Sequence, residues 1–198
     1  MIGLLAFLLG FASLAQAGTA AHPRAPGAVF RVPLAALPDT LNRLLREARN
    51  LRSFHTGPRH APRLTVFFDP NCPFCARFWQ SLWPRHREYR IRWIPVAYVR
   101  PDSARVAASI LLANDPQAAL VQNEEHFDYS NHRGGVMPAY RVPPELDRAI
   151  AKNTQFWRHW FGMLPVFFFR SAAGTHLFVG RPSPAQWRAI RQHALASR

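Results

Sequence analysis

The chain contains two cysteines, Cys72 and Cys75, which are separated only by Pro73 and Phe74. Two thiols at this spacing can alternate between a dithiol and an intramolecular disulfide, and can therefore exchange electrons with cysteines of other proteins. The pair lies where a predicted strand ends and a predicted helix begins. Unpaired N–H groups and the positive dipole end of a helix N-terminus stabilise a thiolate. We therefore predict that Cys72 is the attacking sulfur and that Cys75 resolves the mixed disulfide.

Three other roles for the cysteine pair compete with this one. A structural disulfide is the first, although a loop this short constrains the unfolded chain very little. A zinc site is the second, but it needs two more ligands in a recurring spacing, and the nine histidines are scattered. The third is a pair of inert buried thiols. The sequence favours the redox pair, and it predicts no metal and no cofactor other than the Cys72–Cys75 disulfide itself.

The segments on either side of the pair predict the elements that must hold it. The β-branched and aromatic run 64–68 indicates a buried strand, which the segment 69–71 ends with a polar residue on each side of Pro70. Pro73 suits the first turn of a helix that Pro84 stops, and residues 91–98 indicate a second strand. A strand, a helix and a strand in close succession predict parallel strands joined by a right-handed crossover.

The remainder of the chain predicts helices, then a hairpin, then a last helix. Helices are expected over 104–113, 116–124 and 145–161, and strands over 166–169 and 176–179. Asp115 and Ser183 are expected to cap the second of these helices and the last helix. The order βαβ, helices, ββα defines the fold class as α/β.

The N-terminal part of the sequence divides into three segments. Residues 1–17 carry no charge, run apolar from Ile2 to Leu14 and end in small-x-small, which predicts a signal peptide, although no Lys or Arg precedes the apolar run. The alternative is an uncleaved anchor, but the stretch is shorter than the ~20 residues that a spanning helix needs. Residues 18–38 are rich in Ala and Pro and predict an extended or poorly ordered arm. Asp39 then precedes an amphipathic linker helix within the segment 18–53. Its apolar stripe is expected to pack on the following domain, or to mediate self-association: Leu41, Leu44, Leu45, Ala48 and Leu51.

The chain is strongly basic, with a formal net charge of +14. It has 25 Lys and Arg residues, of which only Lys152 is lysine. The arginines are scattered along the sequence, and no predicted helix carries an unbroken basic stripe. We therefore expect no nucleic-acid partner, and expect the charge to act through solubility and attraction to acidic partners.

From about Phe54 to the C-terminus the sequence resembles the periplasmic thiol-disulfide isomerases of the DsbG/DsbC family, and the DsbG branch more than DsbC. The matching stretches are residues 66–75, Phe78-Trp79, 107–116 and Gly180-Arg181-Pro182. The resemblance implies a thioredoxin-like fold (βαβ + ββα) over residues 54–198 with a helical insertion at about 103–161. It also implies that Pro165 is a cis-proline facing the cysteines, and that a membrane thiol reductase is the electron donor.

Two features depart from the family. Members usually have Thr before the cis-proline, whereas Leu164 stands here. This change removes a hydroxyl beside the active disulfide and makes the expected substrate-facing edge more apolar. Members also carry an N-terminal dimerisation domain, but only about 33 residues lie between the predicted signal peptide and Leu51. Fewer than about 40 residues rarely form a core of their own, so we expect a monomer or a weak dimer.

These observations predict an exported, periplasmic thiol-disulfide oxidoreductase of the isomerase or reductase type. It would act on exported cysteine-containing proteins through Cys72 and Cys75. Because no charged or imidazole side chain lies between the cysteines, isomerase or reductase activity is favoured over oxidase activity. Substrate would bind along Pro73, Phe74, Leu164 and Pro165. The alternative is a non-catalytic periplasmic chaperone or binding module of the same fold, since a fold does not fix a function.

Overall fold

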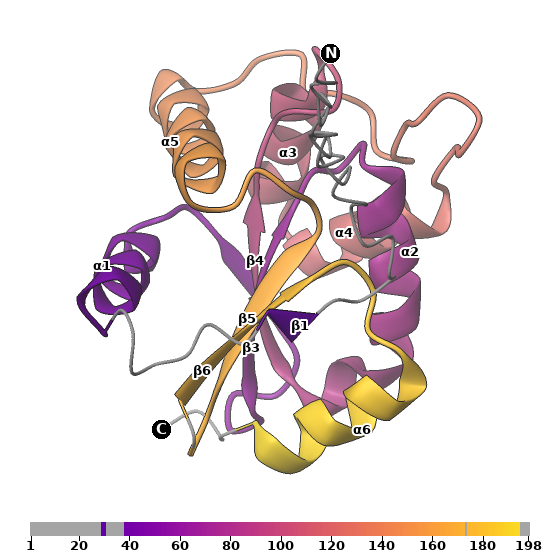
Figure 1. Ribbon diagram of the computed structural model, residues 1–198. Helices are drawn as coiled ribbons and strands as arrows, with labels where there is room; N and C mark the ends of the chain where they lie inside the picture. The colour runs from indigo at the N-terminus through magenta and orange to yellow at the C-terminus, as the bar shows by residue number, and fades with distance from the viewer. Residues whose placement is uncertain (1–28, 31–37, 173, 195–198) are drawn as a thin grey trace, which may run out of the picture.

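The computed structural model describes residues 29–30, 38–172 and 174–194 of the 198-residue chain. One six-stranded sheet, in the order β1-β6-β5-β3-β4-β2, forms its centre, and helices cover both faces (Figure 1). The strands are β1 (Val29–Phe30), β2 (Phe54–Thr56), β3 (Arg63–Phe68), β4 (Arg90–Pro95), β5 (Val166–Ser171) and β6 (Gly174–Val179). The helices are α1 (Pro38–Arg49), α2 (Pro73–Leu82), α3 (Ser103–Leu112), α4 (Pro116–Glu125), α5 (Pro144–Trp160) and α6 (Pro184–His193), with a 3-10 helix η1 (Trp83–Glu88).

Strand β3 lies near the middle of the sheet and leads directly to the cysteine pair. It pairs in parallel with β4 on one side and antiparallel with β5 on the other. The predicted strand–helix–strand unit is therefore confirmed as β3–α2–β4. The predicted hairpin is also confirmed, because β5 and β6 pair antiparallel from Val166↔Val179 to Ser171↔Gly174. The α/β class and the order βαβ, helices, ββα agree with the sequence-based expectation.

The two outermost strands were not expected from the sequence. Strand β2 has three residues and pairs antiparallel with β4, and β1 has two residues and pairs antiparallel with β6. Such short segments contain too few residues to show an alternating pattern. They become strands because the neighbouring strand offers them free backbone donors and acceptors.

Two apolar cores lie on opposite faces of the sheet. One core packs α2, α3, α4 and α6 against one face and includes Cys72, Cys75, Phe78 and Trp187. The other packs α1 and the second half of α5 against the opposite face around Phe67, while Leu146 and Ile150 in the first half of α5 belong to the first core. Because strand β3 contributes alternate side chains to both cores, its position is fixed from both sides.

Helix α1 packs on the catalytic part of the chain, as its apolar stripe predicts. Leu44, Ala48 and Leu51 are buried in the core that includes Phe67, and Leu45 packs against it. The helix begins at Pro38, one residue before the predicted cap Asp39. The side chain of Leu41 and the predicted signal peptide over residues 1–17 lie outside the described parts.

Helices α3, α4 and α5 form the predicted insertion between β4 and β5. Asp115 caps α4 by accepting the backbone N–H of Ala118 at 3.0 Å. Ser183 caps α6 through a capping box with Gln186. Across the described ranges, no helix combines the length and apolar character that crossing a membrane requires.

Candidate active site

The cysteine pair occupies the first turn of α2, at the end of the connection from β3. Cys72 is the N-cap residue, with an extended backbone, and its sulfur accepts the backbone N–H of Cys75 at 3.4 Å. Pro73 occupies the first turn, where a missing N–H costs no helix hydrogen bond. Both sulfurs are free thiols. The strand-to-helix position predicted from the sequence is therefore confirmed.

The two thiols differ in acidity. The pKa of the Cys72 thiol is lowered, first by a hydrogen bond from the Cys75 side chain and then by backbone N–H groups of Cys75 and Phe74, although burial opposes this. The pKa of Cys75 is raised well above its usual value by burial and by the same hydrogen bond with Cys72. A thiolate therefore forms on Cys72 before it forms on Cys75.

A buried carboxylate, Asp69, organises the segment between β3 and the cysteines. Its Oδ1 accepts the backbone N–H of Asn71 at 2.8 Å and the Ser103 hydroxyl at 2.9 Å. Its Oδ2 accepts the N–H groups of Tyr98 at 2.6 Å and Val99 at 2.8 Å. Burial raises the pKa of Asp69, while these hydrogen bonds act in the opposite direction. The carboxylate thus ties the turn before Cys72 to the chain that follows β4.

Asn71, also buried, extends this network into the helical insertion. Its Nδ2 donates to Asp102 and to Ser103, both at 3.2 Å, and its Oδ1 accepts the N–H of Gly134 at 3.0 Å. Each hydrogen-bonding group of the Asn71 side chain therefore has a partner from a distant part of the sequence. Since unpaired buried polar groups are costly, this network favours a single position for the loop that carries Cys72.

Asn123 performs a similar role from α4. Its Nδ2 donates to the carbonyl of Pro70 at 2.9 Å, in the segment that leads from β3 to Cys72. Gly134 packs so closely on Asn123 that an added Cβ would lie 2.0 Å from Oδ1. The position is therefore restricted to glycine, since only a residue without a side chain permits this contact.

A second buried acid, Glu124, lies beside Asn123. Only 1% of its surface is exposed, and its Oε1 accepts from Asn123 Nδ2 at 3.2 Å. Its Oε2 makes no hydrogen bond to the residues that the structure describes. Burial raises the pKa of Glu124 well above its usual value, and the charge on Cys72 raises it further. In turn, the charge of Glu124 contributes to the raised pKa of Cys75.

The residues predicted to bind substrate lie in two segments. The Leu164–Pro165 peptide bond is cis, as the resemblance implies. Leu164 is partly buried and packs against both apolar cores. Phe74 is 62% exposed, an unusual state for a large apolar side chain, whereas Pro73 is half-buried. Phe74 therefore offers an exposed apolar surface in the first turn of α2, and the role of Leu164 in binding stays a prediction.

Sequence reasoning missed the acids and amides behind the cysteines. Asp69 and Asn71 were interpreted only as residues that end a strand, and Asn123 and Glu124 only as part of a helix. A run of polar residues between a buried strand and a redox pair was a usable signal for the first two. No local pattern distinguishes Glu124 from the exposed Glu125 beside it. Among the described residues no cluster of three or more His, Cys, Asp or Glu is arranged to hold a metal ion.

The fold and the cysteine site together are those of a thioredoxin-like protein. Residues 55–195 match the model of the thioredoxin-like domain, and the chain belongs to that family. The predicted resemblance to DsbG is confirmed by sequence. The chain is 30% identical to the thiol:disulfide interchange protein DsbG of Pseudomonas aeruginosa over 135 residues, which cover 66% of this chain and 51% of that protein. It is 37% identical to DsbG of Escherichia coli over 71 residues, or 34% of this chain and 29% of that protein.

A solved structure supports the fold independently. A periplasmic thioredoxin-like protein from Salmonella enterica serovar Typhimurium superposes with a TM-score of 0.57 at 19% identity, covering 76% of this chain and 95% of that one. The chain spans about half the length of the P. aeruginosa DsbG that it matches. The match therefore concerns the part that carries the cysteines.

Proposed function

We propose that this chain is a thiol-disulfide oxidoreductase of the isomerase or reductase type. The observation that carries the proposal is the difference between the two thiols, because the pKa of Cys72 is lowered and that of Cys75 is raised. In a reduced pair of this kind, one sulfur is a nucleophilic thiolate and the other stays protonated until it resolves the mixed disulfide. The similarity to DsbG proteins supports the same reaction.

The proposed reaction has two exchange steps. The Cys72 thiolate attacks one sulfur of a substrate disulfide, forms a mixed disulfide and releases the other substrate sulfur as a thiolate. Cys75 then loses its proton, attacks the Cys72 sulfur and releases the second substrate thiolate. Two electrons pass from the pair to the substrate, and the Cys72–Cys75 disulfide remains. No other cofactor takes part in this scheme. A cysteine sulfenic acid could replace the disulfide in the first step, with water as the leaving group.

The substrates we propose are exported proteins that contain cysteines. The exposed ring of Phe74 offers an apolar contact next to Cys72, and Pro73, Leu164 and Pro165 complete the proposed substrate-binding edge. A substrate strand would lie extended along the Leu164–Pro165 segment and use its backbone for pairing. A membrane thiol reductase would return the pair to its reduced form.

We also propose that the protein acts in the periplasm as a monomer or weak dimer. The apolar residues 1–17 support export, and the related Salmonella protein is periplasmic. The buried face of α1 supports the monomer, because Leu44, Ala48 and Leu51 are covered by the same chain. Light scattering at micromolar concentration tests the assembly state. A stable dimer would contradict it.

Reduction of insulin disulfides tests the proposed activity. Wild-type protein is expected to accelerate insulin precipitation, Cys72→Ser to lose this activity, and Cys75→Ser to accumulate a mixed disulfide with the substrate. The competing function is a non-catalytic chaperone that uses the same apolar edge. If Cys72→Ser prevents aggregation of an unfolded protein as well as wild type does, while neither reduces insulin, the chaperone function replaces the one proposed.

A further inference from the structure

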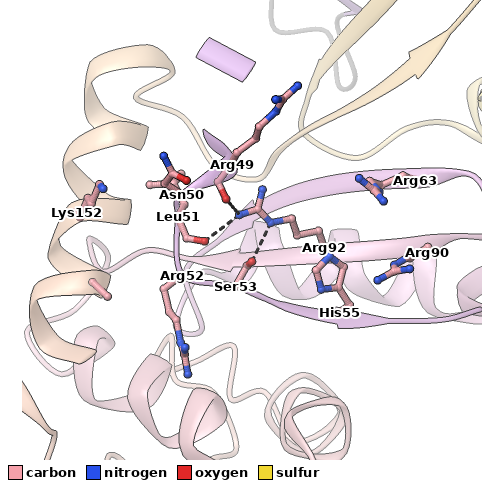
Figure 2. A pocket seen from close by; sticks show the side chains of 11 residues that line it. Arg49, Asn50, Leu51, Arg52, Ser53, His55, Arg63, Arg90, Arg92 and Lys152 are labelled. Carbon is pink, nitrogen blue, oxygen red and sulfur yellow. Dashed lines mark hydrogen bonds between the residues drawn. The ribbon is translucent and has the colours of Figure 1, made fainter. Parts of the chain in front are cut away.

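A cationic hollow lies at the edge of the sheet, where the α1–β2 turn, β2, β3, β4 and α5 meet (Figure 2). Its volume is about 670 Å³. Five arginines and one lysine line it: Arg49, Arg52, Arg63, Arg90, Arg92 and Lys152. No Asp or Glu is among the described residues that line it. The hollow therefore collects a large part of the excess positive charge of the chain in one place.

The Arg92 guanidinium is held in a fixed position at the centre of this hollow. Its Nε donates to Ser53 Oγ at 2.8 Å, and its Nη2 donates to the carbonyls of Leu51 at 2.8 Å and Arg49 at 3.2 Å (Figure 2). Its Nη1 makes no hydrogen bond to the described part of the chain. All three bonded acceptors are neutral, so they orient the guanidinium without neutralising it. A preorganised cation of this kind loses little side-chain entropy when an anion binds.

Among the described residues, no acidic side chain neutralises the cations of the hollow. The ion pairs of the described residues join Arg43 to Glu47 and Asp102 to two arginines, Arg100 and Arg133, and none of these lines the hollow. His55, which also lines it, has its pKa lowered by burial and then by Arg90, Arg92 and Arg63. The three arginines are therefore close enough to His55 to disfavour its protonation. A bound anion would relieve the repulsion between these positive charges.

We propose that the cationic hollow binds a ligand that carries two or more phosphate groups. Six cations that line one hollow exceed what one carboxylate could balance, whereas a diphosphate carries several negative charges in a small volume. Guanidinium groups also match phosphate oxygens with paired hydrogen bonds. The ligand could be a soluble phosphate compound or the phosphate-bearing headgroup of a lipid, and the binding chemistry is the same for both.

The hollow is separate from the cysteine site. Arg63 begins β3 and Cys72 follows its other end, and six strand residues at about 3.3 Å each place them about 20 Å apart. A ligand in the hollow therefore does not touch the sulfurs. Its binding is independent of the proposed redox activity, and Cys72→Ser is expected to bind it as wild type does.

Isothermal titration with inorganic pyrophosphate at low ionic strength tests the proposal. Arg63→Gln combined with Lys152→Gln removes two cations from different walls of the hollow, and neither side chain makes a hydrogen bond to the described residues. This double variant is expected to bind pyrophosphate about tenfold more weakly or worse, as loss of charge-assisted contacts predicts. The matched control is Arg188→Gln combined with Arg191→Gln, which removes two exposed cations from α6 and is expected to leave affinity unchanged.

Three outcomes would overturn the proposal. These are no pyrophosphate binding by wild type, equal affinity of the two double variants, and citrate binding as tight as that of pyrophosphate. Thermal unfolding checks that both variants are folded. Sedimentation with vesicles of phosphatidylcholine alone, or mixed with cardiolipin, whose headgroup carries two phosphates, then distinguishes a lipid headgroup from a soluble phosphate compound. Binding to the mixed vesicles that the hollow variant loses assigns a lipid headgroup, and its absence assigns a soluble phosphate compound.

Discussion

The two ends of strand β3 have opposite electrostatic character. After Phe68 the chain enters a closed region, where the side chains of Asp69, Asn71 and Asn123 form buried hydrogen bonds. Asp69 accepts from the Asn71 backbone, Asn71 accepts from the Gly134 backbone, and Asn123 donates to the Pro70 carbonyl. Before Leu64 it borders an open hollow where cations have no acidic partner among the described residues. The closed end uses its polar groups to hold two sulfurs in place. The open end leaves its charges available, and this difference indicates internal chemistry at one end and an external ligand at the other.

The largest effect is expected from a methyl group added to the closed end. The Gly134→Ala Cβ would lie 2.0 Å from Asn123 Oδ1 and 2.5 Å from its Cγ, and Asn123 is itself bonded to Pro70. Overpacking together with loss of a buried hydrogen bond predicts a loss of about 2 kcal/mol or more in the free energy of unfolding. Urea denaturation measures it.

A double-variant cycle separates this clash from other causes. Asn123→Ala removes the obstructing amide, so Gly134→Ala should cost much less in the Asn123→Ala background than alone. Arg63→Gln at the open end is the contrasting substitution, and it should change stability by no more than about 0.5 kcal/mol. Equal losses of unfolding free energy from Gly134→Ala and Arg63→Gln would contradict the proposed difference between the two ends of β3.

The next effect concerns the thiols of the closed end. Because the pKa of Cys72 is lowered and that of Cys75 is raised, Cys72 should carry most of the thiolate near neutral pH. Its alkylation by iodoacetamide should be more than about tenfold faster than that of Cys75, since each pKa unit changes the thiolate fraction tenfold. Mass spectrometry of partly alkylated protein measures the ratio. Faster reaction at Cys75 would reverse the proposed roles.

A smaller effect is expected from the residue before the cis-proline. On the proposed substrate-binding edge, Leu164→Thr would place a hydroxyl near the pair, and a hydrogen bond to a thiolate would stabilise the reduced form. One such bond, about 1 kcal/mol, would raise the redox potential by roughly 20 mV. Equilibration with glutathione measures the potential. Arg63→Gln is the control from the open end, and a shift of equal size there would show that the two ends are electrostatically coupled.

The smallest effect is expected at His55 in the cationic hollow. Arg63 is one of the charges that lower the pKa of His55, so Arg63→Gln should raise it towards the usual value near 6.5. A depressed histidine pKa in the folded state costs stability as the pH falls below the unfolded value. The variant should therefore lose less stability than wild type below about pH 6.5. An NMR titration of the His55 ring measures the pKa, and an unchanged value would contradict the electrostatic account.

The sequence by itself determined the chemistry of the sulfurs and most of the fold. Cys72, Pro73 and Cys75 are adjacent in the chain, and their strand-to-helix setting depends on local patterns of apolar residues and proline. Local patterns also suffice for β3, α2 and the β5–β6 hairpin, because periodicity within one element is visible in its own residues. The stripe on α1 predicted a buried face for the same reason.

Only the tertiary structure decided what surrounds the sulfurs and where the charge gathers. Glu124 and Asn123 come from a helix about 50 residues after Cys72, and only the packing of the insertion brings them beneath the cysteines. The arginines are scattered along the sequence, yet Arg49, Arg63 and Arg92 line one hollow. Both arrangements join residues that are distant in the chain, and no local pattern records such contacts because they depend on how whole elements pack.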